Sequence, residues 1–198
     1  MKPLPRSFYE RPTVQVARDL LGKIIVHKEC SGRIVETEAY LGSGDLAAHS
    51  ARGPTPRNCV IFGPPGHAYV YFIYGMYECL NLIAEPAGVA GCVLIRALEP
   101  LEGIARMRRR RPTARRDEDL ANGPGKLTRA LGIGLKHNGA DLTCGPIQVF
   151  ADENQPAFDI GVSPRIGITK SADLPLRFFI EGSRFVSRRR PAIPGRAW

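Results

Sequence analysis

The sequence lacks the features that would mark a membrane, secreted or metal-binding protein. No apolar run approaches the roughly 20 residues of a membrane-spanning helix, and the N-terminal segment has no apolar signal-peptide core. The five cysteines are widely spaced without a C-x-x-C pair, and the four histidines show neither H-x-x-x-H nor H-E-x-x-H spacing. We therefore expect a cytoplasmic protein with reduced thiols, no membrane contact and no metal site.

Acidic residues are scarce relative to basic ones. The chain has 28 Lys and Arg against 19 Asp and Glu, a net charge of +9, and a pI near 9.7. Such an excess is typical of a protein whose partner is a polyanion, with nucleic acid as the first candidate. A basic surface kept for solubility or membrane contact stays open as the alternative, because net charge alone specifies no ligand.

Length and composition predict one globular domain over residues 1–198, since 43% of the residues are hydrophobic and 24% are charged. We expect a helix at 13–21, capped by Thr13 and ended by Gly22, and a hairpin of strands 23–28 and 33–40. A second hairpin is expected at 67–84. The remaining expected elements are a strand at 92–98, a helix from 101, a mobile surface loop at 110–119, a glycine-rich turn and helix at 122–133, and strands at 146–150, 164–169 and 175–182.

These elements predict an α+β fold. Most strands follow one another directly, which favours a curved, mainly antiparallel sheet with short surrounding helices and a protruding β-hairpin. The segment 41–65 is rich in Gly, Pro, Ser and Ala and is expected to be mostly loop. Loops of this length inside a compact domain usually serve a function.

Two glutamates stand two residues apart in the apolar segment RIVETEAY. The two-residue period of a strand places Ile34, Glu36, Glu38 and Tyr40 on one face. Burying a carboxylate is costly unless it is paired, hydrogen-bonded or needed for a shifted pKa, so at least one glutamate is a functional-site candidate. The alternative, that both form structural salt bridges with arginines, stays open.

Tyrosines gather in the second hairpin, HAYVYFIYGMY, at Tyr69, Tyr71, Tyr74 and Tyr77. Packing across strands accounts for most aromatic residues in sheets. Tyr74 is expected at the tip of a tight turn, where a large side chain on a basic protein suits a wedge inserted between base steps of DNA.

The segment NGPGKLT resembles a phosphate-binding loop only in part. The nucleoside-triphosphate motif requires a glycine where Leu120 stands and Ser or Thr where Leu127 stands, so we exclude that site. The backbone amides of Gly123 and Gly125, with Lys126 beside them, could still hold a DNA phosphate. A plain turn at the start of a helix is the alternative.

Six segments, in order, resemble the 3-methyladenine (alkyladenine) DNA glycosylase family: RIVETEAYLG, AAHS, TPRN, YVYFIYGMYECLN, IRALEPLEG and NGPGKL. Strings this long, in order and at matching intervals, are far more specific than a lone motif. The resemblance implies a base-excision repair enzyme that binds double-stranded DNA and flips out a damaged purine. It would then hydrolyse the N-glycosidic bond without a metal or organic cofactor. The implied substrates are 3-methyladenine, 7-methylguanine, hypoxanthine and ethenoadenine.

The resemblance also implies residue roles. Glu38 would be the general base that activates the attacking water, with Glu36 as a supporting neighbour and Arg96 positioning the water or a nearby phosphate. Tyr40, His49 and Tyr71 would form the walls of the base pocket, and Asn81 would crowd the exocyclic amine of normal guanine. The implied DNA contacts are the wedge Tyr74, Ile61 as a second wedge that Phe62 or Met76 could assist, Tyr77 and Lys126.

Two other functions stay open. A non-catalytic nucleic-acid-binding module would use the basic hairpin and stacking tyrosines without turnover. An enzyme that acts on free nucleosides through Glu36 and Glu38 would need no extended basic surface, so the net charge argues against it. The motif segments place a carboxylate, stacking aromatics and a wedge in the family's order, and no lysine replaces them as a Schiff-base nucleophile. The leading hypothesis is therefore a monofunctional glycosylase, acting as a monomer at the nucleoid.

Overall fold

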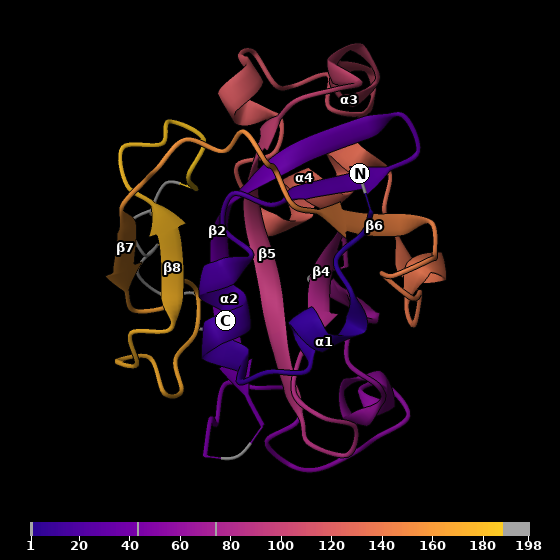
Figure 1. Ribbon diagram of the computed structural model, residues 1–198, viewed down its shortest axis with the longest axis vertical. Helices are drawn as coiled ribbons and strands as arrows, with labels where there is room; N and C mark the ends of the chain where they lie inside the picture. The colour runs from indigo at the N-terminus through magenta and orange to yellow at the C-terminus, as the bar shows by residue number, and fades with distance from the viewer. Residues whose placement is uncertain (1, 43, 74, 188–198) are drawn as a thin grey trace.

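A curled antiparallel sheet forms the body of the protein in the computed structural model, which describes residues 2–42, 44–73 and 75–187 (Figure 1). The strand order is β3-β4-β5-β2-β1-β6, and β8 pairs with both β2 and β7. The strands are β1 (Ile24–His27), β2 (Cys30–Leu41), β3 (Ala68–Ile73), β4 (Tyr77–Ile83), β5 (Gly91–Pro100), β6 (Ile147–Phe150), β7 (Ile160–Ser163) and β8 (Arg177–Ile180).

Strands β2 and β5 form the long central pair. The other edge of β2 serves two partners, because β1 pairs with its first part, as in Ile24↔Arg33, and β8 with a later part, as in Glu36↔Phe179. Because β1 and β8 pair with different parts of the same edge of β2, the sheet curls. Figure 1 shows β7 and β8 set apart from β1 and β6. The predicted α+β fold with a curved antiparallel sheet is confirmed.

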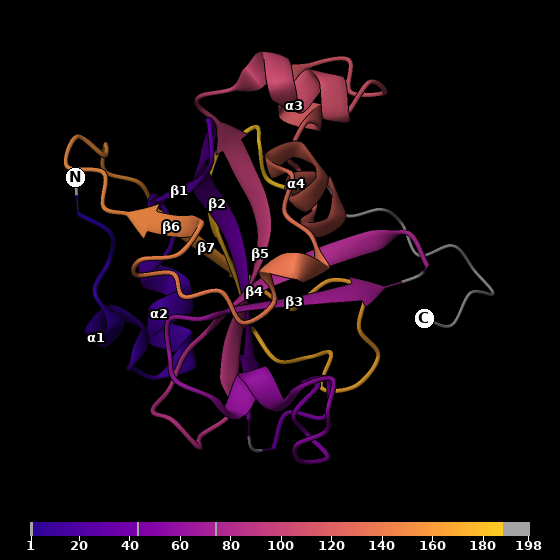
Figure 2. The same cartoon turned by 90° about the vertical axis from the view of Figure 1, so that its right-hand side faces the viewer.

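Short helices surround the sheet. They are α1 (Arg6–Tyr9), α2 (Thr13–Asp19), α3 (Ile104–Arg110) and α4 (Pro124–Leu131), with single 3₁₀ turns η1 (Cys59–Phe62), η2 (Asp117–Asp119) and η3 (Leu135–His137). Figure 2 shows α1 and α2 on one side of the molecule and α3 above α4 at its upper end. In the described part of the chain, none of the helices has the length and apolar character needed to cross a membrane.

One face of the sheet carries the main hydrophobic core. Alternate residues of neighbouring strands belong to this core, among them Leu80, Leu82, Val93 and Ile95. Helices α2 and α4 contribute to it, and the Thr37 hydroxyl donates to the backbone carbonyl of Ala17 in α2 at 2.8 Å. Because side chains alternate along a strand, the intervening residues face the other side of the sheet, where the site lies.

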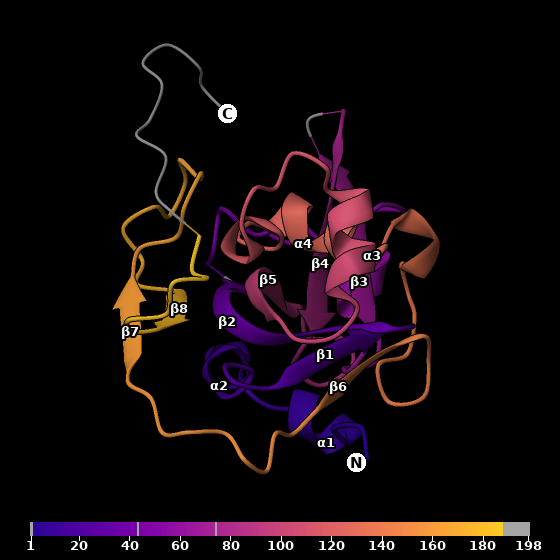
Figure 3. The ribbon, with the colours of Figure 1, turned by 90° about the horizontal axis from the view of Figure 1, so that it is seen from above.

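The β3–β4 hairpin extends beyond the rest of the sheet, as the sequence predicts (Figures 2 and 3). Helix α4 packs against the start of β4, where the Thr128 hydroxyl donates to the backbone carbonyl of Glu78 at 2.9 Å. Gly125 permits a close approach, since a Cβ atom there would lie 2.7 Å from Cδ1 of Tyr77. Tyr74, the predicted wedge, lies outside the described residues.

Two local predictions about the first third of the chain need correction. Pro12, not Thr13, stands at the N-cap of α2, and Thr13 is buried because its amide and hydroxyl both donate to Glu85, at 2.6 and 2.8 Å. Strand β2 begins at Cys30, so the turn of the first hairpin shortens to Lys28 and Glu29. The backbone of Lys28 adopts a positive φ of 54° to close it.

The strand predicted at 164–169 is wrong. Strand β7 ends at Ser163, and the residues after Pro164 form an irregular loop. In this loop the backbone amide of Ile166 donates to the side chain of Glu38. The segment 110–119 also differs from a featureless loop, because it contains η2, and Asp117 pairs with Arg108 at 2.7 Å.

Candidate active site

A row of directly paired residues crosses four strands on the face opposite the main core. Glu38 of β2 pairs with Leu94 of β5, Leu94 with Asn81 of β4, and Asn81 with Tyr69 of β3. Residues directly opposite one another in an antiparallel pair lie on the same face. The sheet therefore brings the predicted base and the predicted pocket residues to one surface.

Glu38 is a fully buried carboxylate whose two oxygens are both held. Its Oε1 accepts from the backbone amide of Ile166 at 2.8 Å and lies 3.2 Å from Nη1 of Arg96, while Oε2 accepts from the Tyr40 hydroxyl at 2.9 Å. A buried charge of this kind is tolerated because a cation and hydrogen bonds replace its lost hydration. Glu38 is therefore held in one orientation.

Glu36 is buried as well, but its oxygens are saturated by other partners. Oε1 accepts from Nε of Arg96 at 3.0 Å, from Nε of Arg177 at 2.6 Å and from the Ser187 hydroxyl at 2.8 Å, and Oε2 accepts from the Ser187 amide at 2.7 Å. A carboxylate so fully occupied has a structural role, which agrees with the interpretation of Glu36 as a supporting neighbour.

Arg96 joins the two glutamates, with Nε on Glu36 and Nη1 toward Glu38. Burial alone would lower the pKa of Arg96, but the charges of Glu38 and Glu36 outweigh burial and raise it above its ordinary value. The guanidinium is thus a permanent cation beside the predicted base. The alternative that both glutamates form structural salt bridges with arginines describes Glu36 fully, because it pairs with Arg96 and Arg177. It describes Glu38 only in part, because Glu38 pairs with Arg96 and is also the predicted base.

An irregularity between β2 and β5 creates this arrangement and corrects one prediction. The pairing shifts by one residue at Ile34/Glu36 and shifts back at Glu36/Thr37, so that Val35 and Arg96 have no direct partner across the two strands. Ile34 consequently packs in the main core, whereas Val35 packs in a small cluster with Ala97. Ile34 was predicted to share the face of the glutamates, and the bulge places it on the opposite one.

Tyr40 lies beside Glu38. Burial and the charge of Glu38 raise the pKa of Tyr40 well above its ordinary value, so its hydroxyl stays protonated and donates to that carboxylate. The guanidinium of Arg165 lies over the Tyr40 ring, with its carbon 4.6 Å from the ring centroid. Tyr40 is therefore held by an anion at its hydroxyl and by a cation over its ring.

His49 and two hairpin tyrosines form a cluster of rings. The centroids of His49 and Tyr71 are 4.5 Å apart, and Nδ1 of His49 lies 3.0 Å from the Tyr69 hydroxyl. Burial, aided by the charge of Arg57, lowers the pKa of His49, so its imidazole is neutral at neutral pH. The structure thus groups the predicted residues His49 and Tyr71, and it adds Tyr69, which the strand pattern had assigned to packing.

Asn58 organises the loop that carries His49, a role that the sequence did not reveal. Its amide nitrogen donates to the backbone carbonyl of His49 at 2.8 Å and to that of Gly53 at 3.1 Å, while its oxygen accepts from the Thr55 hydroxyl at 2.9 Å. An asparagine whose donors and acceptor are all used across one loop fixes the shape of that loop. A cavity of about 220 Å³ opens beside it, against His49 and Tyr69.

The predicted DNA-contacting residues divide into exposed and buried ones. Met76 is 64% exposed and Tyr77 40% exposed, which suits contact with a partner. Lys126, at the start of α4, donates to the Asn122 side chain at 2.6 Å. Ile61 is only 1% exposed and packs in η1 against the site side of the sheet, which argues against the predicted role as a second wedge.

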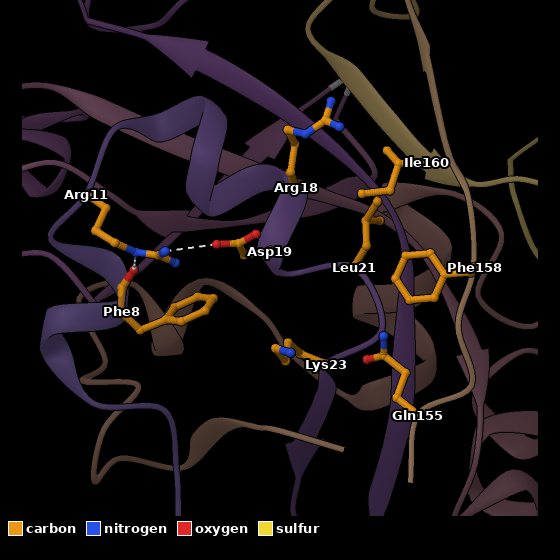
Figure 4. A pocket seen from close by; sticks show the side chains of 9 residues that line it. All are labelled: Phe8, Arg11, Arg18, Asp19, Leu21, Lys23, Gln155, Phe158 and Ile160. Carbon is orange, nitrogen blue, oxygen red and sulfur yellow. Dashed lines mark hydrogen bonds and ion pairs between the residues drawn. The ribbon is translucent and has the colours of Figure 1, made fainter. Parts of the chain in front are cut away.

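A cavity of about 310 Å³ lies elsewhere on the molecule. It is formed around α2, between Phe8, Gln155 and Phe158, and three cationic side chains border it (Figure 4). None of the predicted site residues that the structure describes lines this cavity. The buried carboxylate and the ring cluster, and not this cavity, therefore define the candidate active site.

Comparison with known proteins identifies the family of this chain. The model of the methylpurine-DNA glycosylase family matches residues 7–184. The chain is 55% identical to a protein of Methanoculleus marisnigri over 194 residues, covering 94% of this chain and 99% of that one. It is 51% identical to a protein of Chlorobaculum tepidum over 199 residues, covering 98% and 95%. Both relatives are provisionally named 3-methyladenine DNA glycosylase.

A buried carboxylate beside aromatic rings on a basic protein, together with these relatives, defines a DNA N-glycosylase, an enzyme of DNA repair that hydrolyses N-glycosidic bonds. More closely, the chain belongs to the methylpurine-DNA glycosylase family. This membership resolves the choice between an enzyme and a non-catalytic binding module in favour of the enzyme.

Proposed function

We propose that this enzyme removes alkylated and deaminated purines from double-stranded DNA, with a water activated by Glu38 as the nucleophile. The substrate class is the one that the resemblance implies: 3-methyladenine, 7-methylguanine, hypoxanthine and ethenoadenine. The observation that carries the proposal is the fixed, buried carboxylate of Glu38, which shares a sheet face with Tyr69, Tyr71 and Asn81.

The proposed reaction begins when a Glu38 oxygen accepts a proton from water. The water oxygen bonds to the C1′ carbon of the sugar, while the bond from C1′ to the base nitrogen breaks and its electron pair leaves with the base. For an N-alkylated purine, this pair neutralises the positive charge, so the base leaves as a neutral molecule and an abasic site remains. The charge on the sugar resembles an oxocarbenium ion, which a nearby carboxylate stabilises.

Arg96 supports this chemistry as a fixed cation beside Glu38. Its Nη1 lies 3.2 Å from a carboxylate oxygen of Glu38 and helps to hold that group in place. The Tyr40 hydroxyl and the Ile166 amide orient the same group. We propose that Arg96 acts in this way and also directs the attacking water.

The proposed base pocket is built from aromatic rings. Tyr40, His49 and Tyr71 would contact the flipped purine, and a cationic alkylated base gains about 0.5–2 kcal/mol of cation–π attraction over a neutral one. Damaged pairs also cost less to open, which adds selectivity before the pocket is reached. Asn81 would oppose the exocyclic amine of normal guanine. Because Nδ1 of His49 already contacts the Tyr69 hydroxyl, its Nε2 is the ring nitrogen left to form one hydrogen bond with the edge of the base.

The proposed DNA contacts lie on the hairpin and at the start of α4. Tyr74 would fill the stack that the flipped base leaves, and the exposed residues Met76 and Tyr77 would contact the DNA as well. Lys126 would contact a backbone phosphate. We further propose that residues 1–198 act as one domain and as a monomer, at the nucleoid, without a cofactor.

The test is single-turnover release of 3-methyladenine, 7-methylguanine and hypoxanthine from defined duplexes in the presence of a metal chelator. We expect release by the wild type and a loss of about 10²–10⁴-fold in Glu38→Gln, the range that general-base catalysis contributes. Glu102→Gln, which changes an exposed carboxylate, is the matched control and should keep the wild-type rate. A Glu38→Gln variant with full activity and intact DNA binding would refute the assignment of the base.

A free-nucleoside hydrolase is the second candidate function, and the same samples test it. Assays with free alkylated nucleosides in place of the duplex should give no measurable release. Efficient cleavage of nucleosides that exceeds cleavage of the duplex would favour that candidate over a DNA repair enzyme.

A further inference from the structure

We propose that Arg165 and Asp45 form a positioning pair, which joins two loops and holds Tyr40 and the Ile166 amide against Glu38. The inference rests on the proposed role of Glu38 as general base. Neither residue is among the catalytic or pocket residues that the sequence motifs imply. Both lie in irregular segments on either side of the site.

The pair has the geometry of a fixed joint. Nη1 of Arg165 lies 2.6 Å from Oδ2 of Asp45 and Nη2 lies 2.7 Å from Oδ1, and both side chains are 0% exposed. Two parallel bonds between a guanidinium and a carboxylate define relative orientation as well as distance. The two loops that carry these residues are therefore locked to each other, although the residues are 120 positions apart in the sequence.

Asp45 extends the joint into the loop that follows β2. Its Oδ2 also accepts from the backbone amide of Leu41, and its Oδ1 from that of Ala47, both at 3.1 Å. The carboxylate thus shapes the turn between the end of β2 and the segment that leads to His49. Any shift of Asp45 moves that segment relative to the sheet.

Arg165 extends the joint to the strand of the proposed base. Its Nη1 donates to the backbone carbonyl of Ala39 at 2.9 Å, and its guanidinium carbon lies 4.6 Å from the centroid of the Tyr40 ring. Ala39 stands between Glu38 and Tyr40 in β2. The guanidinium is consequently anchored to the backbone beside Glu38 and to the ring of the residue that bonds to it.

Arg165 affects the position of Glu38 through two hydrogen bonds that other residues donate to it. Ile166, the next residue after Arg165, donates its amide to Oε1 of Glu38 at 2.8 Å, and Tyr40 donates its hydroxyl to Oε2 at 2.9 Å. Both partners therefore depend on where Arg165 lies. Arg165 is a positioning residue in this scheme because it acts through Tyr40 and Ile166.

Stability alone gives a poor account of such a pair. The cost of removing two charges from water offsets most of the attraction between them, so a buried ion pair contributes little net stability. Its contribution is a defined geometry, and displacing a catalytic group by about 1 Å can slow a reaction by about 100-fold. Lysine would keep the charge of Arg165 but would lose the two parallel hydrogen bonds to Asp45 and the planar guanidinium over the Tyr40 ring.

The experiment compares Arg165→Lys with the wild type in single-turnover base release from a hypoxanthine duplex, normalised to the enzyme fraction that binds DNA. We expect a rate loss of about 100-fold with an unchanged Kd for the duplex. Arg33→Lys is the matched control, because Arg33 lies on β2, the strand of Glu38, and also bridges carboxylates, those of Glu99 and Asp152. Its rate should stay at the wild-type value.

Asp45→Asn and the double variant keep the proposal testable if Arg165→Lys folds poorly. Asparagine keeps the shape of Asp45 but removes its charge and one acceptor. Two residues of one network have non-additive effects, so the double variant should be no slower than the slower single variant.

A wild-type rate in either single variant, or losses that multiply in the double variant, would overturn the positioning pair while leaving the proposed function intact. A fully active Glu38→Gln variant would overturn the proposed function and this inference with it. A loss confined to Kd would place Arg165 in DNA binding and would also refute the proposal.

Discussion

The imidazole rings of His27 and His137 meet edge to face, with their centroids 4.6 Å apart. Both side chains are buried, and Nδ1 of His27 lies 2.9 Å from the backbone carbonyl of Leu131, which requires a proton on that nitrogen. The contact joins β1 to η3 and to the end of α4. Protonation of these histidines would therefore affect the stability of the fold.

We expect this histidine pair to make the fold less stable in mild acid. Burial lowers the pKa of His27 and of His137 below the ordinary value, and positive neighbours such as Lys28 add to this. In the unfolded chain both titrate near 6.5, so below that pH the unfolded state binds more protons. Stability is then complete above the unfolded pKa and is lost as the pH falls through the lower folded values.

Urea unfolding between pH 7.5 and pH 5 measures this effect. His27→Gln, which cannot be protonated, should flatten the decline of the unfolding free energy with falling pH, and His67→Gln at the partly exposed bridge to Asp141 serves as the comparison. An unchanged slope in His27→Gln would show that the acid sensitivity arises elsewhere.

Gly125→Ala should disturb the hairpin. The added methyl would lie 2.7 Å from Cδ1 of Tyr77, so α4 and the hairpin must separate or shift. Overpacking of this kind typically costs about 1–3 kcal/mol, and the displaced hairpin should weaken duplex binding and slow base release. Thermal unfolding and single-turnover assays measure the two effects.

Gly123→Ala is the control for that variant, because a Cβ there has no neighbour closer than 3.5 Å and the backbone φ of 166° is extended. It should leave both the melting temperature and the rate near the wild-type values. Equal losses in the two variants would point to the start of the helix and not to the contact with Tyr77.

Asn81→Ser should relax discrimination against normal guanine. Asn81 is buried and donates to the backbone carbonyl of Tyr69 at 3.3 Å, so its side chain is held on the site face of the sheet. A smaller side chain leaves room for an exocyclic amine, and a pocket difference of this size is worth about 10–200-fold. The ratio of guanine to hypoxanthine release from matched duplexes reports the change, and a constant ratio would count against this role.

Lys126→Ala should weaken duplex binding equally for damaged and undamaged sequences. Removal of one phosphate contact reduces the slope of log K against log salt by about 0.9. Titrations at several salt concentrations give the slope, with Lys28→Ala in the exposed turn of the first hairpin as the control. A slope equal to that of the wild type would exclude a phosphate contact at Lys126.

Much of the site could be predicted from the sequence because it lies on regular strands. The alternation in RIVETEAY and in the second hairpin placed Glu38, Tyr40, Tyr71 and Asn81 on strands, and the pairing of those strands brings them to one face. The glycines before Lys126 likewise predicted the start of α4. In these cases the local sequence pattern predicts the same secondary structure that the folded protein has.

The tertiary structure decided which partners surround those residues. A bulge at Val35, set by the pairing of β2 with β5, moved Ile34 to the core side, and packing of η1 buried Ile61. Two of the contacts that hold Glu38 and Tyr40 come from Ile166 and Arg165, in a loop that the sequence pattern predicted to be a strand.

The physical reason is the range of the interactions. Alternation along a strand depends on neighbours two residues away, so the sequence by itself determined the strands that carry the site, the chemistry of their side chains and the family. An ion pair such as Arg165–Asp45 joins irregular segments that no local propensity places together. Its geometry exists only once the sheet has curled and the loops have packed, and for that reason only the tertiary structure revealed it.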